Sequence, residues 1–311
     1  MRTTTDTPYL ALVRSLSPFP LLADVAADVA AKVQAIREGA RGPTMSQQCK
    51  MAPRDAATWQ AALILTGRRK VHTSSQTKLD KATETRSGYR NRGLTMATAF
   101  EASAFISGKW DACPGATDAC RFACVGSQTG QGRLSSSLIA RVGRTLAMLH
   151  DLDAFLACLD DEVSRLERAA SRKGYRLAFR TNVSTDHPRL AAYLAEKHPS
   201  VDFYDYTAVM ANMRRKDGVR RIYSRKDGRT EQTMRMLSEG HGVCVVFDVT
   251  ARSKGPLPAT WEGYDVIDGD IDDLWFTRAP DSGPFVVGLR VKATTADQLQ
   301  RTIASGFAVA A

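Results

Sequence analysis

The chain has 311 residues, of which 43% are hydrophobic and 24% charged, a composition typical of a globular protein with a large core. No run of about 18 apolar residues occurs, which excludes a membrane-spanning helix, and the first residues do not resemble a secretory signal. Six cysteines are too few for a disulfide scaffold. We therefore expect a reduced, cytoplasmic protein whose clustered cysteines are metal ligands or catalytic thiols.

The net charge of +10 comes from two short segments. Residues 66–92 contain eight Lys and Arg against two acidic residues, and residues 214–229 contain the same numbers. Such segments either bind a polyanion or are solvated loops. The candidates for nucleic-acid contacts are Arg68, Arg69, Lys70, Arg214, Arg215, Lys216, Arg220, Arg221 and Arg225. On the first reading, the partner is a nucleic acid or a nucleotide.

Two helices are expected in the N-terminal part of the chain. Apolar residues recur at helical spacing from residue 20 to 37, and a second helix is predicted from Asp55, whose carboxylate can cap it, to Gly67. Residues 68–93 carry almost no aliphatic side chains, so we expect a basic linker or arm there. The predicted organisation is a helical appendage (1–67), the arm (68–93) and a larger domain (94–311).

The larger domain alternates strands with helices. Helices are predicted over 134–150, 151–171, 186–197 and 229–239. Strands are predicted over 94–100, 176–183, 201–207, 220–224, 243–249, 264–270 and 285–293. This alternation predicts an α/β fold with a parallel sheet, as a complete or partial β/α (TIM-like) barrel or, alternatively, a doubly wound sheet.

The strongest chemical signal is a loop with the pattern C-x6-C-x3-C, formed by Cys113, Cys120 and Cys124. Three thiolates suit a [4Fe–4S] cluster with one iron open to an exchangeable ligand. A structural zinc ion prefers four ligands, so zinc would need a further Cys or His. The polar residues around the three cysteines do not resemble a protein core. Cys158 and Cys244, in contrast, lie in apolar patterns typical of core residues.

Seven sequence blocks follow one another between about residues 78 and 295. They are CPGATDACRFAC, LAFRTNVSTDHPRLAAYL, FYDYT, YSRKDGR, GVCVVFD, VIDGDIDDLWF and VVGLRVKA. With these blocks the chain resembles the phage "gene product 88" family, which implies a location in the cytoplasm of the host cell. The cysteine loop of that family is similar to that of phage barrel proteins related to radical S-adenosylmethionine (SAM) enzymes. The usual radical SAM spacing is C-x3-C-x2-C, and the gaps here are wider. Val125 follows the third cysteine, where family members commonly have tyrosine.

Polar residues at the ends of predicted strands are candidates for the rest of the site, because β/α barrels collect reactive groups at the carboxyl ends of their strands. Arg180, Asn182 and Asp186 could contact a SAM-like cofactor, although Asp186 could instead cap the next helix. Tyr206 could contact the substrate or carry a radical if it faces the barrel interior. Asp268 and Asp270 could orient a substrate or merely form a turn.

The sequence therefore predicts a radical-SAM-like iron–sulfur enzyme acting on a nucleic acid or nucleotide, with an electron donor as a further partner. The alternative is a nucleic-acid-binding protein with a structural zinc loop and no catalysis. A nuclease that uses a tyrosine nucleophile ranks last, because the paired metal-binding histidines of such enzymes are missing. The phosphate-binding, dinucleotide-binding and serine-esterase glycine motifs do not occur.

Overall fold

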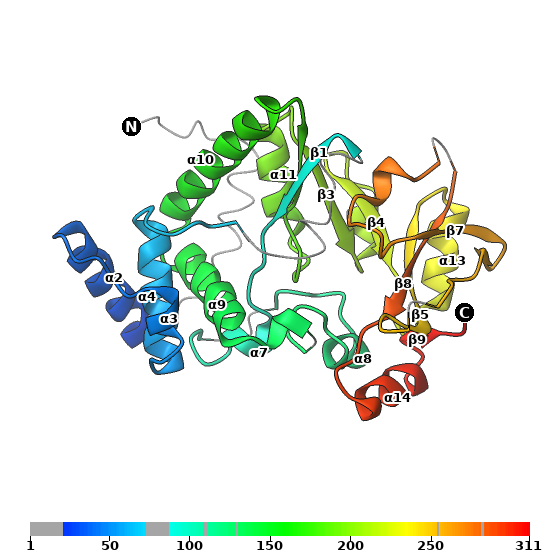
Figure 1. Ribbon diagram of the computed structural model, residues 1–311, viewed down its shortest axis with the longest axis horizontal. Helices are drawn as coiled ribbons and strands as arrows, with labels where there is room; N and C mark the ends of the chain where they lie inside the picture. Colours follow the sequence, from blue (N-terminus) through cyan, green and yellow to red (C-terminus); the bar gives the residue numbers. More distant parts are fainter. Residues whose placement is uncertain (1–20, 73–86, 108–110, 129, 254, 281–282) are drawn as a thin grey trace.

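The computed structural model describes residues 21–72, 87–107, 111–128, 130–253, 255–280 and 283–311 (Figure 1). The first 20 residues, and Lys78, Lys81 and Arg86 of the expected basic arm, lie outside the described residues. None of the described helices is both long enough and apolar enough to cross a bilayer.

The two helices predicted near the N-terminus are confirmed. They are α2 (Ala23–Arg37) and α4 (Pro53–Leu65), with the short α3 (Met45–Gln48) between them. Asp55 does not cap α4, because the helix already begins at Pro53; its carboxylate instead contacts the buried ammonium of Lys32 on α2. Lys32 also binds Asp28 at 2.8 Å and Thr58 at 2.7 Å, so one cation joins the two helices.

A mostly parallel sheet of nine strands forms the centre of the molecule. The strands are β1 (Tyr89–Gly93), β2 (Arg176–Arg180), β3 (Asp202–Thr207), β4 (Arg220–Ser224), β5 (Val243–Thr250), β6 (Thr260–Trp261), β7 (Tyr264–Asp268), β8 (Val286–Val291) and β9 (Ala308–Val309). They lie in the order β1-β2-β3-β4-β5-β8-β7-β6, and β9 pairs with β5. Among the described strands, only β6 is antiparallel to its neighbour. The predicted α/β class with a parallel sheet is confirmed, whereas the described strand pairs do not close the sheet into a barrel.

The first strand lies where a linker was expected. β1 occupies residues 89–93, inside the segment 68–93, while the strand predicted over 94–100 is an extended chain leading into α7 (Ala99–Ala102). The sequence YRNRG gives no apolar signal for a strand. It is stabilised by its ladder to β2 and by the buried Asn91, whose amide donates to the Tyr204 hydroxyl at 2.8 Å.

Helices cover one face of the sheet. The remaining helices are α8 (Asp118–Phe122), α9 (Ser135–His150), α10 (Leu152–Ser171), α11 (Pro188–Lys197), α12 (Met210–Met213), α13 (Thr230–Ser238) and α14 (Ala296–Ala304), with the 3-10 turns η1 (Gly130–Arg133) and η2 (Trp275–Thr277). Figure 1 shows α2, α4, α9 and α10 gathered at one end, and α13 and α14 towards the other. Phe179 and Phe203 share one hydrophobic cluster with residues of α2, α4, α9 and α10, so the expected N-terminal appendage packs into the same core as the sheet.

The other face of the sheet carries the alternate side chains of the same strands. Ala178, Tyr204, Ile222 and Cys244 form a second buried cluster, which also contains Leu274 and Trp275 at the start of η2. The strand period of two places successive side chains on opposite faces. At the carboxyl ends of the strands, this inner face borders the candidate site.

Candidate functional site

A cavity of about 990 Å³ lies at the carboxyl ends of β2, β3, β4, β5 and β8. Its walls also include the cysteine loop and the side of α9 that carries Arg141 and Arg144. A volume near the upper end of the range for small-molecule sites leaves room for a cofactor together with part of a substrate. Parallel α/β folds place their ligands at this edge of the sheet.

All three cysteines of the loop line this cavity. Cys113, Cys120 and Cys124 are half-buried free thiols. Burial, followed by the neighbouring Cys124, Asp186 and Cys120, raises the pKa of the Cys113 thiol to about 12. Among the described residues, no three His, Cys, Asp or Glu side chains are arranged to hold a metal ion.

The cysteine loop is braced by the loops that follow β2 and β4. The Asp186 amide donates to the Ala112 carbonyl at 2.8 Å, and the Cys113 thiol contacts the Ser184 carbonyl at 3.5 Å. The Thr117 hydroxyl donates to the Asp227 carboxylate, which follows β4. These contacts join the loop to the segments after β2 and β4.

Two glycines of the loop permit this close approach. A Cβ at position 115 would lie 2.7 Å from the Ala208 Cβ and 2.9 Å from its carbonyl oxygen. A Cβ at position 126 would lie 2.8 Å from the Ser184 Cβ and 3.6 Å from the Cys124 sulfur. Only glycine fits without displacing these neighbours, so Gly126 keeps the space beside Cys124 open.

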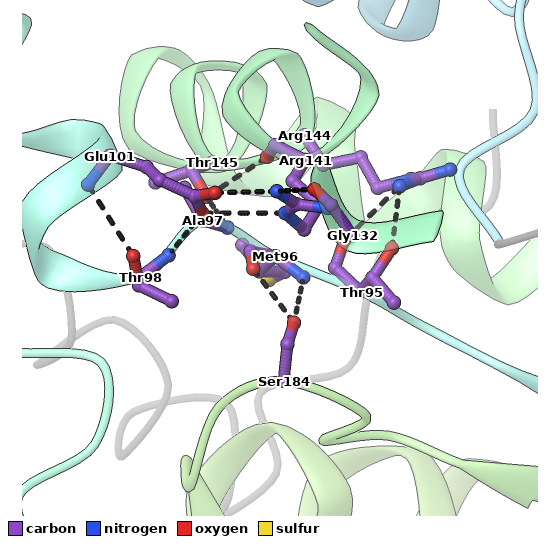
Figure 2. A network of polar contacts seen from close by, with 10 residues as sticks. All are labelled: Thr95, Met96, Ala97, Thr98, Glu101, Gly132, Arg141, Arg144, Thr145 and Ser184. Carbon is purple, nitrogen blue, oxygen red and sulfur yellow. Dashed lines mark hydrogen bonds and ion pairs between the residues drawn. The ribbon is translucent and has the colours of Figure 1, made fainter. Parts of the chain in front are cut away.

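A polar network connects the loop after β2 with α9 (Figure 2). The Ser184 hydroxyl donates to the Met96 carbonyl at 2.8 Å and accepts from the Met96 amide at 3.2 Å. The buried Arg141 forms an ion pair with Glu101 and donates to the Gly132 carbonyl at 2.8 Å. These contacts hold the segment after β1 between the strand ends and α9.

Arg144, one turn further along α9, binds the chain just after the first basic run. Its guanidinium donates to the Val71 carbonyl, to the His72 carbonyl at 3.4 Å and to the Thr95 hydroxyl at 2.9 Å. The Glu162 carboxylate accepts from the amides of Val71 and His72, at 2.8 Å and 2.9 Å. Burial lowers the pKa of Arg144 to about 10.

Arg180 and Tyr206 face each other in the cavity wall. The Arg180 guanidinium lies 4.2 Å from the centre of the Tyr206 ring and forms a 2.8 Å ion pair with Asp273. Neither the Tyr206 hydroxyl nor the Arg180 Nε has a partner among the described residues, although both atoms are buried. Burial and Asp273 raise the pKa of Tyr206 well above its usual value. Tyr206 therefore lies on the inner face, as its candidate role requires.

Asn182 and Asp186 line the cavity, but their polar groups are occupied by the protein itself. The Asn182 side chain donates to Asp205 at 2.7 Å and accepts from the His187 amide at 2.9 Å. Asp186 accepts from the Thr207 hydroxyl at 2.9 Å and from the Ala208 amide at 3.0 Å. Asp186 does not cap α11, which has no side-chain cap. Both residues hold the loops after β2 and β3 in place.

Asp268 and Asp270 do not line the described cavity wall; instead they bind cations that do. Arg290 pairs with Asp268 at 2.9 Å and with Asp270 at 3.4 Å, and Lys292 lies 3.7 Å from Asp270. Arg290 and Lys292 both line the cavity. Arg290 lies on β8 and Lys292 directly follows it, so the carboxylates at the end of the paired strand β7 hold these two side chains in place.

The structure separates the two basic segments. Arg68, Arg69 and Lys70 line the cavity. Residues 214–219 precede β4 and so lie at the opposite edge of the parallel sheet, beside the start of β3. Their charges are largely paired within the protein: Arg214 with Glu239, Arg215 and Arg221 with Asp217, and Arg220 with Asp202. Arg225 lies near the cavity edge but donates to the carbonyls of Gly306 and Phe307.

Sequence reasoning missed several cavity residues, of which Lys226 is the most informative. Lys226 is buried, donates to the Ser224 hydroxyl at 2.8 Å and lies 5.5 Å from the centre of the Phe307 ring. Its place in the YSRKDGR block, directly after a predicted strand, was the available signal. Arg141 and Arg144 gave only the weaker signal of two cations on a predicted helix.

The comparisons with known proteins yield one match. A family model described as Gene product 88 matches residues 68–310. The matched region begins at the basic run that lines the cavity and covers all nine strands. No curated protein and no solved structure matches the chain.

Proposed function

The chain belongs to the gene product 88 family, and we propose that it is a radical-SAM-like iron–sulfur enzyme that acts on a nucleic acid or nucleotide. The observation that carries the proposal is the convergence of all three loop thiols on one large cavity with cationic walls. Proteins of this type are expected in the reducing cytoplasm of the host cell, where thiols stay free, and would need an electron donor as a partner.

The arrangement of the sheet supports a partial β/α barrel for this function. From β1 to β5 the spatial order follows the order in the chain, and all these neighbours are parallel. Beyond β5 the order reverses to β8-β7-β6, so the barrel-like succession is limited to β1–β5. An open, barrel-like sheet leaves its inner face and its carboxyl edge accessible to a bound group.

The donor set fits a three-thiolate cluster. Cys113, Cys120 and Cys124 would be the ligands, and Gly126 leaves space beside the Cys124 sulfur. A [4Fe–4S] cluster held in this way would leave one iron open for SAM and, once reduced by an electron donor, would supply the electron for radical chemistry. Binding requires three thiolates, so the three protons must leave and the turn-rich loop must draw its sulfurs together.

Other residues of the chain would position the ligands. Arg180 offers a guanidinium to a carboxylate of the cofactor, and Lys226 offers a buried ammonium to a second anionic group. Tyr206 carries a hydroxyl without a partner among the described residues and is placed to contact the substrate. Asn182 and Asp186 act indirectly, because they hold the loops that carry the site. Asp268 and Asp270 act through Arg290 and Lys292.

The deciding experiment is metal analysis of protein purified without oxygen. We expect about four irons and equivalent sulfide per chain, with broad brown visible absorbance. Cys113→Ala, Cys120→Ala and Cys124→Ala should each lose the iron, whereas the matched control Cys158→Ala should keep it. A cysteine-loop variant with unchanged iron would refute the ligand assignment.

The same measurement tests the alternative function. A colourless protein with about one zinc per chain would indicate a structural zinc loop in a nucleic-acid-binding protein without radical chemistry. If the iron is present, the reduced protein is next incubated with SAM. Formation of 5′-deoxyadenosine would support the proposed reaction. If the cluster is intact but no 5′-deoxyadenosine forms, the protein binds an iron–sulfur cluster and the proposed SAM cleavage is wrong.

A further inference from the structure

The basic run Arg68-Arg69-Lys70 lies on the rim of the cavity, directly after α4. Arg68 and Lys70 are exposed, and Arg69 is half-buried with an Nε atom that has no partner among the described residues. Three adjacent cations therefore face the entrance to the candidate site. Within the described part of the chain, no ion pair neutralises any of the three.

The rim is held in a fixed position by its C-terminal neighbours. Val71 and His72 are buried, and both of their backbone amides donate to Glu162 while both of their carbonyls accept from Arg144. A dipeptide bound through all four polar groups leaves little freedom to the residue before it. The basic run Arg68-Arg69-Lys70 therefore belongs to a fixed edge of the cavity.

The whole cavity has an excess of positive charge. Among the described lining residues, nine are Lys or Arg and two are Asp. Arg141, Arg180, Arg290 and Lys292 have carboxylate partners. The rim run, Arg144 and Lys226 form no ion pair with a described carboxylate. A low-dielectric cavity with this balance attracts an anionic ligand.

We infer that the rim binds the phosphates of a single nucleic-acid strand, one nucleotide of which enters the cavity; this inference rests on the proposed function and narrows its substrate class. Three adjacent cations on the rim, of which Arg68 and Lys70 are exposed and Arg69 is half-buried, match the repeating phosphates of a strand, whereas a free nucleotide offers only one phosphate cluster. Chemistry on a base requires that the base be unpaired, so a single strand fits better than a duplex. The basic residues near the start of β4 take no part, because they pair internally at the other edge of the sheet.

The test compares two variants with the same change in net charge. The rim variant is Arg68→Gln/Arg69→Gln/Lys70→Gln. The control variant is Arg214→Gln/Lys216→Gln/Arg220→Gln, which removes three exposed cations at the opposite edge. Fluorescence anisotropy measures binding of a labelled 15-nucleotide single strand, its duplex and a mononucleotide over a series of salt concentrations.

We expect the rim variant to bind the strand about 100-fold more weakly than the wild type at 0.1 M salt. The slope of log affinity against log salt concentration should become shallower by about 2, because each phosphate contact on a single strand contributes about 0.7 to this slope. The control variant should bind like the wild type, and the duplex and the mononucleotide should bind more weakly than the strand. Equal losses in both variants, no binding of the strand, or preferred binding of the mononucleotide or the duplex would overturn the inference. Iron content does not depend on this binding, so a failure here is distinguishable from a failure of the cluster proposal.

Discussion

Arg144 and Glu162 bind the same dipeptide in complementary ways: the guanidinium takes the carbonyls of Val71 and His72, and the carboxylate takes their amides. Burial of two opposite charges is costly unless every polar group finds a partner. Here the backbone between the two side chains supplies those partners. The junction between the basic run and the protein core therefore depends on both residues.

Replacing Glu162 by Gln should destabilise the protein by about 3 kcal/mol, because buried Arg144 loses the nearby charge that balances it and two backbone amides lose a charged acceptor. Urea unfolding measures the change in free energy. Asp161→Asn, an exposed neighbour on the same helix, is the control and should change the stability by less than about 0.5 kcal/mol. Equal stabilities of the two variants would show that the contacts of Glu162 with Val71 and His72 contribute little to the stability of the protein.

The stability of the protein should fall between about pH 6.5 and pH 4 because of His187. Burial lowers the pKa of this histidine to about 4, so the unfolded chain binds a proton in this range while the folded chain does not. The contribution is fully present above pH 6.5 and is lost progressively towards pH 4, reaching about 3 kcal/mol. In His187→Gln, the difference from the wild type should shrink by that amount over the same pH range. A parallel pair of pH profiles would contradict the prediction.

Cys113 should react slowly with iodoacetamide in metal-free protein. Because its pKa is raised to about 12, the thiolate fraction at pH 7.5 is on the order of a thousandfold below that of an ordinary cysteine. Peptide mapping by mass spectrometry measures the alkylation rate, with exposed Cys49 as the internal reference. The rate at Cys113 should keep rising up to about pH 12. A plateau below pH 9 would show that the thiol is not shielded as described.

Gly115→Ala should displace the cysteine loop from the end of β3. The added methyl group would lie within 3 Å of Ala208 backbone atoms, which cannot move aside as a flexible side chain could. We expect a loss of about 1–3 kcal/mol in unfolding free energy and reduced iron binding. Gln128→Ala, an exposed position in the same loop, is the control. Wild-type stability and iron content in Gly115→Ala would indicate that the loop adjusts freely.

Much of the fold was predictable because apolar patterns mark buried strands and helices. The strand RRIYS (220–224) was predicted with its observed bounds, and VCVVFDV is the core of β5. β1 was missed because its stability comes from a ladder to β2 and from the pair Asn91–Tyr204, which are 113 residues apart. Long-range partners of this kind leave no local periodicity.

The candidate site was predictable only in part, for a similar reason. The three thiols are close in sequence, so their convergence could be expected, and Arg180 and Tyr206 follow from strand ends. In contrast, Asp268 and Asp270 are engaged by Arg290, about 20 residues further along the chain. Their spacing alone did not distinguish a free carboxylate from one already bound by a neighbouring strand.

The residues that contact the cysteine loop are synthesised at different times, some of them long after the loop itself. Besides the loops after β2 and β4, the loop is held by α14, where Gln298 donates to the Phe122 carbonyl at 3.4 Å and Arg301 stacks 4.2 Å from the centre of the Phe122 ring. During synthesis the three thiols leave the ribosome nearly 180 residues before these last partners. Until α14 has emerged, the cysteine loop of the nascent chain lacks these two contacts and is held by the segments that follow the earlier strands.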